Sequence, residues 1–206
     1  MIRSIAMLCG LASCGAISDA RSALKFKDIA EANYAVRENF IDRPGTIPDR
    51  IPTVGIARFD GAARIFIDPV TDGTSDNILI YGDIGMTADF RAGTMTGQID
   101  DMRGATNIRE RGADTFDVDG VITVGTNGGT IGEGRANDWS ATYDGQLETG
   151  IGDFAVDGVL TGQFVGTVPD QEVQISGIYA DDTDGRAQHD GAVYPVFVEI
   201  GAPLVR

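Results

Sequence analysis

The chain has 206 residues, of which 42% are hydrophobic and 28 are glycine, so we expect one domain whose core is rich in small side chains. Its 31 acidic residues outnumber 16 basic ones and give a net charge of −15, with no basic stripe to displace counterions from phosphates. This balance excludes nucleic acid as an expected partner. The simplest interpretation of the acidity is solubility.

The first fourteen residues, "MIRSIAMLCGLASC", have the features of a secretory signal. Arg3 precedes an apolar run over residues 5–12, which is too short to span a bilayer, and small residues lead to a cysteine. The stretch "LASC" resembles the lipobox of bacterial lipoproteins, which implies cleavage after Ser13 and acylation of Cys14, palmitate included. The alternative is an ordinary signal peptide followed by a free cysteine. Since Cys9 leaves with the signal, no disulfide is expected in the mature chain.

Residues 14–52 are predicted to form a tether with a short helix. "FKDIAEANYAVRENF", from Phe26 to Phe40, contains good helix formers. Its apolar stripe is expected to include Phe26, Ile29, Ala30 and Tyr34. "DRPGTIPDRIP" then ends the helix with three prolines and a glycine, which marks a domain boundary near Pro52.

From Thr53 onward, alternation of apolar and polar residues predicts antiparallel strands. In "MTADFRAGTMTGQID" a turn about Ala92-Gly93 would pair Ala88 with Gly97 and Met86 with Ile99. "DPVTDGTSDN" and "GTNGGTIGEGRAND" are predicted to be loops. The units "FDVDGVIT" and "FAVDGVLT" are either a duplicated strand unit or two barrel strands whose similar positions require similar residues.

Large side chains set against glycines on one face predict a barrel with a filled core. Gly158, Gly162 and Gly166 are expected to face inward between large residues. The other expected inward residues are Phe59, Ile80, Ile84, Met86, Phe90, Met95, Ile99, Phe116, Val118, Ile122, Trp139, Tyr143, Leu147, Phe154, Leu160, Phe164, Val173, Ile175 and Tyr179. Outward positions are expected for Val121, Val159, Val165 and Ile178, either as strand formers or as a docking patch.

Several motifs, taken in order, resemble the barrel domain of transferrin-binding protein B and related bacterial surface lipoproteins. They are "GIARFDG", "MTADFRAGTMTGQID", and "GQFVG" followed by "QEV", within a region that spans most of Thr53 to Ala202. The sequence departs from the family pattern where Phe59 and Val165 stand in place of tyrosine and Thr167 in place of proline. The chain has room for one barrel, whereas the transferrin receptors of the family carry two lobes. The resemblance implies a surface lipoprotein that binds a partner.

No catalytic constellation is evident, and we expect neither an enzyme nor a cofactor. The single histidine, His189, is interpreted as a surface loop residue, and no G-x-S-x-G or phosphate-loop motif is present. "DDTDGRAQHD", from Asp181 to Asp190, gathers carboxylates, but its register does not fit a calcium loop, and a solvated hairpin loop is the expected structure. No metal ligand is assigned.

The sequence therefore predicts an all-β fold, a single antiparallel β-barrel of about eight strands with a short N-terminal helix and a flexible leader. The expected division is a signal peptide over 1–13, a tether over 14–52 and the barrel over 53–206. The expected function is that of a lipid-anchored binding module at the outer membrane, on its surface or periplasmic face, which recognises a protein or nutrient carrier through loops and outer strand faces. The alternatives are a lipocalin-like carrier of a small hydrophobic molecule and a structural protein.

Overall fold

A computed structural model describes residues 13–41, 43–68, 77–107, 113–132, 134–166 and 175–205. Residues 1–12 of the predicted signal over 1–13, most of the predicted loop 68–77, the "QEV" motif and Val173 lie outside these residues. The helices are α1 (Ser13–Ile41) and the short 3-10 helix η1 (Pro48–Arg50). The strands are β1 (Ile56–Ile67), β2 (Ile78–Asp89), β3 (Thr94–Thr106), β4 (Asp114–Ile131), β5 (Asp138–Thr149), β6 (Gly152–Gly166), β7 (Ile175–His189) and β8 (Ala192–Pro203).

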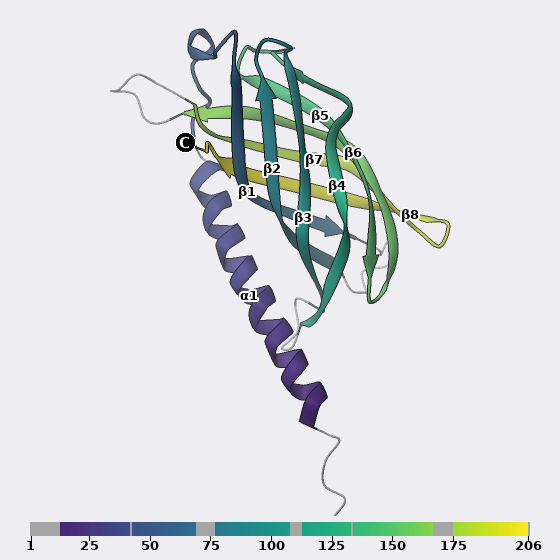
Figure 1. Cartoon of the computed structure of the whole chain (residues 1–206). Helices are drawn as coiled ribbons and strands as arrows, with labels where there is room; N and C mark the ends of the chain where they lie inside the picture. Colours follow the sequence, from purple (N-terminus) through teal and green to yellow (C-terminus); the bar gives the residue numbers. More distant parts are fainter. Residues whose placement is uncertain are drawn as a thin grey trace, which may run out of the picture.

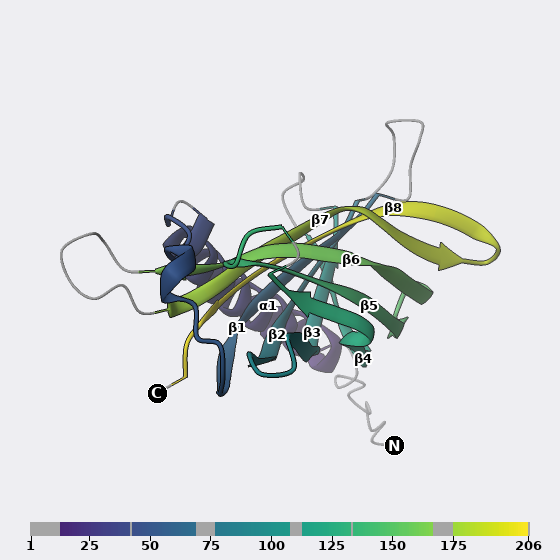
Figure 2. The same cartoon turned by 90° about the horizontal axis from the view of Figure 1, so that it is seen from above.

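The eight strands form one closed antiparallel barrel, as the sequence predicted (Figure 1). Each strand pairs with the next along the chain, and β8 closes the barrel by pairing with β1. Seen from above, β6–β8 form a wall opposite β1–β4 (Figure 2). Closure leaves no unpaired sheet edge, which is the usual way an antiparallel sheet protects its backbone hydrogen bonds.

The barrel interior is filled by one hydrophobic cluster of inward side chains. Phe164 belongs to it with no exposed surface, and its ring centroid is 6.0 Å from that of Phe59 and 5.4 Å from that of Phe90. Glycines make room for large neighbours: a Cβ on Gly82 would lie 2.7 Å from Cγ of Met102. The remaining predicted core residues that belong to the cluster are Ile80, Ile84, Met86, Met95, Ile99, Val118, Ile122, Trp139, Tyr143, Leu147, Phe154, Leu160 and Ile175, with Phe116 packed against it.

The hairpin between β2 and β3 has a different register from the predicted one. Ala88 pairs with Met95 and Met86 with Gly97, a shift of two residues that keeps every side chain on its predicted face. The loop is longer than two residues because the carboxylate of Asp89 accepts hydrogen bonds from the N–H groups of Arg91 and Ala92, each at 3.0 Å. Such a side-chain cap stabilises a longer turn.

The predicted orientation of β7 side chains is correct at Ile175 but wrong from Gly177 to Tyr179. Val165 pairs with Gly177 but Gly166 with Ile175, so one residue of β7 has no partner on β6 and the alternation shifts by one. Ile178 is therefore fully buried in the core, and Tyr179 faces outward. Val165 does face away from the core, but it is only 2% exposed because Gly45 pairs with it.

Two predicted loops are largely strand in the structure. β4 runs to Ile131, and its pairing with β5 is interrupted only between Val124 and Gly129. Residues 125–131 of "GTNGGTIGEGRAND" therefore belong to β4, and Asp138 begins β5. Gly125 has a φ of +81°, which a residue with a side chain rarely adopts. Most of Asp181 to Asp190 belongs to β7, which ends at His189.

Helix α1 packs along the outer wall of the barrel (Figure 1). The side-chain amide of Asn33, which is 4% exposed, donates to the carbonyls of Ala63 on β1 at 2.9 Å and of Gly82 on β2 at 3.4 Å. The latter carbonyl is available because the β2–β3 ladder is irregular at that point. Tyr34, predicted to belong to the contact stripe, is instead 57% exposed, because Asn33 takes the position against the sheet.

A charged network also holds α1 to the barrel. Glu199 on β8 is 3% exposed and accepts from Arg37 of the helix at 2.9 Å and from the Tyr179 hydroxyl at 2.8 Å. The hydrogen bond to Glu199 raises the pKa of Arg37, and burial, followed by the contact with Glu199, raises the pKa of Tyr179 above its usual range. Because the helix covers this carboxylate, the network stabilises one position of α1.

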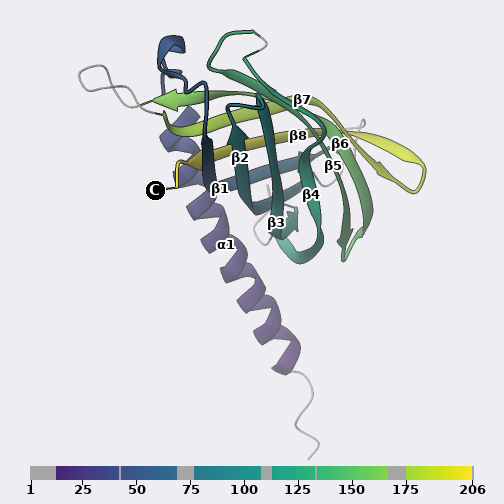
Figure 3. The same ribbon diagram turned by 45° about the horizontal axis from the view of Figure 1, so that its top comes forward.

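The predicted helix over Phe26–Phe40 is present, and it continues toward the N-terminus as far as Ser13. Its 29 residues correspond to a length of about 43 Å. Figures 1 and 3 show that the N-terminal end of α1 extends beyond the barrel. Cys14 lies at that end, far from the strands along the chain.

Candidate functional site

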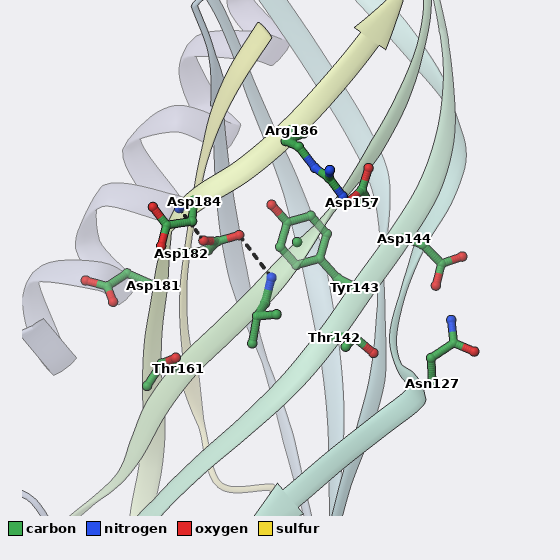
Figure 4. A pocket seen from close by; sticks show the side chains of 12 residues that line it. Asn127, Thr142, Tyr143, Asp144, Asp157, Thr161, Asp181, Asp182, Asp184 and Arg186 are labelled. Atoms are coloured by element: carbon green, nitrogen blue, oxygen red, sulfur yellow. Dashed lines mark hydrogen bonds and ion pairs between the residues drawn. The ribbon is translucent and has the colours of Figure 1, made fainter. Parts of the chain in front are cut away.

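The candidate site is an open pocket of about 720 Å³ on the barrel wall formed by β5, β6 and β7 (Figure 4). Its rim consists of outward side chains, among them Thr142, Asp157 and Val159. Its floor includes Tyr143, Gly158 and Asp182, which occupy inward positions of their strands. The pocket therefore lies where the wall of the barrel is open between two strands.

An interruption of the β6–β7 ladder produces this opening. Asp157 pairs with Arg186, and regular pairing resumes only at Thr161 with Asp181. The β7–β8 ladder is irregular at the same part of β7, between Asp182 and Gly185. An extra residue in β7 therefore forms a bulge relative to both neighbours, and bulges of this kind redirect side chains and open a sheet locally.

The carboxylate of Asp182 replaces part of the missing backbone pairing. It is 4% exposed and accepts from the N–H of Val159 at 3.2 Å and from the N–H of Asp184 at 2.7 Å (Figure 4). Two glycines make space for it, because a Cβ on Gly158 or Gly185 would collide with Asp182 Oδ2 or with the Tyr143 hydroxyl. The glycine spacing of β6 and β7 is thus part of the construction of the site.

Tyr143 lies below this carboxylate with its hydroxyl directed toward it (Figure 4). The residue is 1% exposed, and its hydroxyl makes no hydrogen bond of normal geometry within the protein. Burial, together with the neighbouring Asp182, raises the pKa of Tyr143 well above its usual range. The phenol is therefore neutral, and its hydroxyl lies at the floor of the pocket without a hydrogen bond of normal geometry.

The pocket is strongly acidic. Five carboxylates line it, from Asp144, Asp157, Asp181, Asp182 and Asp184, against the single guanidinium of Arg186. That guanidinium forms a salt bridge with Asp157, so it does not offset the other four. Burial, and then the charges of Glu199 and Asp182, raise the pKa of Asp181.

The acidic residues do not form a metal centre in the structure. Across the described residues, no group of three or more His, Cys, Asp or Glu side chains has an arrangement that could hold a metal ion. The pocket carboxylates come from three strands and surround an open space.

The structure separates the residues that the sequence singled out. Cys14 is at the far end of α1, while Val159 lies on the rim of the pocket and is 48% exposed, as predicted. Val121, its counterpart in the other repeated unit, is 44% exposed, also as predicted. His189 is not a surface loop residue, because it is the last residue of β7 and its side chain is 25% exposed. Its ring stacks on that of Phe154, with 4.7 Å between the ring centroids.

Sequence reasoning missed the role of Asp182 and Tyr143. Tyr143 faces inward as the alternation predicts, but alternation says nothing about the place of its hydroxyl. Asp182 was assigned to a loop because "DDTDG" is dense in turn residues. The available signal was Gly158, a strand glycine facing Gly185 across a gap, since paired inward glycines indicate that other atoms occupy the space between them.

Comparisons of the chain with protein-family models, with curated proteins and with solved structures found no match. The resemblance to the barrel domain of transferrin-binding protein B therefore stays a prediction.

In the described part of the chain, no helix combines the length and the apolar character that crossing a bilayer requires.

Proposed function

We propose that this chain is a non-enzymatic binding module of the cell envelope, anchored to the outer membrane through acylated Cys14, which recognises a partner protein with the outer wall of its barrel. One observation carries the proposal: the pocket at β5–β7 opens on the outside of a barrel whose inside is occupied by the protein's own side chains. A barrel of eight strands has an interior just wide enough to be filled in this way. The outer wall and the loops remain available for binding in such a barrel.

The packing of the core is the argument against the alternative, a lipocalin-like carrier. Phe59, Phe164 and Trp139 fill the interior between glycines, and each is at most 2% exposed. A carrier of a small hydrophobic molecule needs a cavity inside the barrel. Native mass spectrometry of the purified full chain tests this point, because a bound lipid or haem would favour the carrier.

The arrangement of α1 supports the anchor. Its C-terminal half is attached to the barrel through Asn33 and Arg37, whereas its N-terminal end, where Cys14 lies, extends beyond the strands (Figure 3). An acyl group at that end would hold the barrel at a distance from the bilayer. Multiple acyl chains would bind firmly, because each buried methylene contributes about 0.8 kcal/mol.

The anchor is tested by Cys14→Ser, with Cys9→Ser as the matched control. We expect Cys14→Ser to move the full chain from the membrane to the soluble fraction, while Cys9→Ser leaves it with the membrane. Separation of inner and outer membranes by density then tests the location. If the Cys14→Ser protein stays membrane-bound after a high-salt wash, the lipid anchor is wrong.

A further inference from the structure

We propose that the pocket at β5–β7 binds the side chain of an arginine or lysine from a basic segment of a partner protein. This inference rests on the proposed function, because it assigns a ligand class to the outer wall. It joins two independent observations, an excess of carboxylates around the pocket and an unpaired hydroxyl at its floor.

The charge of the pocket selects a cation. Asp144, Asp181, Asp182 and Asp184 are not offset by a positive charge within the pocket, since Arg186 is paired with Asp157. Charges of one sign gathered in a concave surface reinforce one another and attract ions of opposite sign. An anionic ligand is excluded on the same ground, and a neutral apolar ligand would leave the carboxylates of the rim without compensation.

The hydroxyl of Tyr143 indicates that the ligand carries N–H donors. It is buried, makes no hydrogen bond of normal geometry within the protein, and lies beside Oδ2 of Asp182. Together these two oxygens form a pair of acceptors at the floor. A guanidinium or ammonium group placed there would donate to both, and it would satisfy the group that folding leaves unpaired.

The size of the pocket fits a long side chain with part of its backbone. Its volume of about 720 Å³ lies within the range of pockets that bind drug-sized ligands. Val159, half-exposed on the rim, offers an apolar surface to the methylene stem of lysine or arginine. A free polyamine has the same charge chemistry, so the experiment must separate the two sources.

The test uses the full chain and a fluorescein-labelled peptide, Gly-Arg-Gly-Arg-Gly, with binding followed by fluorescence anisotropy at low and physiological salt. A peptide with citrulline in place of arginine keeps the shape but removes the charge. The pocket variant is Asp144→Asn with Asp184→Asn, both exposed positions. Its matched control is Asp119→Asn with Glu148→Gln, an exposed cross-strand pair on β4 and β5 outside the pocket, which removes the same amount of charge.

We expect the arginine peptide to bind and the citrulline peptide not to bind. The pocket variant should weaken binding by about three- to twentyfold and the control by less than about twofold, since each exposed ion pair contributes modestly. Tyr143→Phe should weaken binding by about threefold without lowering the melting temperature, because it removes a hydroxyl that has no partner in the free protein. If Tyr143 has only a structural role, Tyr143→Phe should lower the melting temperature and leave binding of the peptide unchanged.

Other outcomes would overturn the proposal. Equal losses in the pocket variant and its control would mean that only the overall acidity attracts the peptide. Spermidine binding more tightly than the peptide would identify a free polyamine as the ligand. Binding of CaCl₂ that the pocket variant abolishes would identify a metal site. Membrane fractionation of Cys14→Ser does not depend on any of these results, so failure of the anchor and failure of this inference are distinguishable.

Discussion

Replacing Asp182 by alanine should destabilise the barrel far more than replacing the neighbouring Asp184. The Asp182 carboxylate is 4% exposed and accepts two backbone N–H groups, from Val159 and Asp184, where the β6–β7 ladder is interrupted. Asp184 contributes only its backbone N–H to this arrangement, and its side chain is exposed. Asp184→Ala is therefore the matched control.

The magnitude follows from the two N–H groups that would lose their acceptor. A buried donor left unpaired costs about 1–3 kcal/mol, but the N–H of Val159 lies beside an open pocket that water can enter, so its cost is at the low end. We expect Asp182→Ala to lower the free energy of unfolding by about 2–4 kcal/mol and Asp184→Ala by less than about 0.5 kcal/mol. Asp182→Asn keeps one acceptor oxygen, so its loss in the free energy of unfolding should lie between those of the two alanine variants.

Urea unfolding of the full chain, followed by circular dichroism, measures these differences. The slope of the unfolding free energy against urea concentration should be unchanged, so that the shift in the unfolding midpoint reports stability alone. In thermal melts the Asp182→Ala loss corresponds to a decrease of roughly 5–15 °C. If Asp182→Ala is as stable as the Asp184→Ala control, the carboxylate does not hold β6 and β7 together, and the account of the pocket floor is wrong.

Three further predictions concern the core, the pH response and the outer wall. Phe164→Ala should cost about 3–5 kcal/mol in urea unfolding, because a fully buried ring leaves a cavity; a variant as stable as the parent would indicate an unfilled interior. The raised pKa of Asp181 means that its charged form destabilises the fold, so this penalty appears as pH rises through the folded pKa. Asp181→Asn should therefore raise the free energy of unfolding at pH 7, by less than about 1 kcal/mol because the group is largely solvated, and the gain should vanish near pH 4. Val159→Lys should change the free energy of unfolding by less than about 0.5 kcal/mol yet weaken binding of the arginine peptide. Val121→Lys, at a similarly exposed position outside the pocket, should leave binding of the peptide intact. A large loss of stability in Val159→Lys would show that Val159 is buried.

The sequence by itself determined the fold class and most of the core. Alternation along "ILIYGDIGMTADF" and "FAVDGVLTGQFVG" placed residues such as Ile84, Met86 and Phe164 on the inner face, and all three are buried. These predictions succeed because side chains alternate between the two faces of a strand, and burial of one face requires an apolar residue at every second position. The helix over Phe26–Phe40 is also local in origin, although its contact stripe depends on the carbonyls that the strands leave available to Asn33.

Only the tertiary structure decided where the alternation breaks. The bulges in β7 depend on how many residues β6 and β8 place opposite it, and no local pattern records that number. One extra residue reverses the facing of the side chains as far as the next bulge, which is why Ile178 is inside and Tyr179 outside. The candidate site has the same origin: Asp182 accepts from Val159, 23 positions away in the chain, because closure of the barrel brings an interrupted strand beside the glycines of its neighbour.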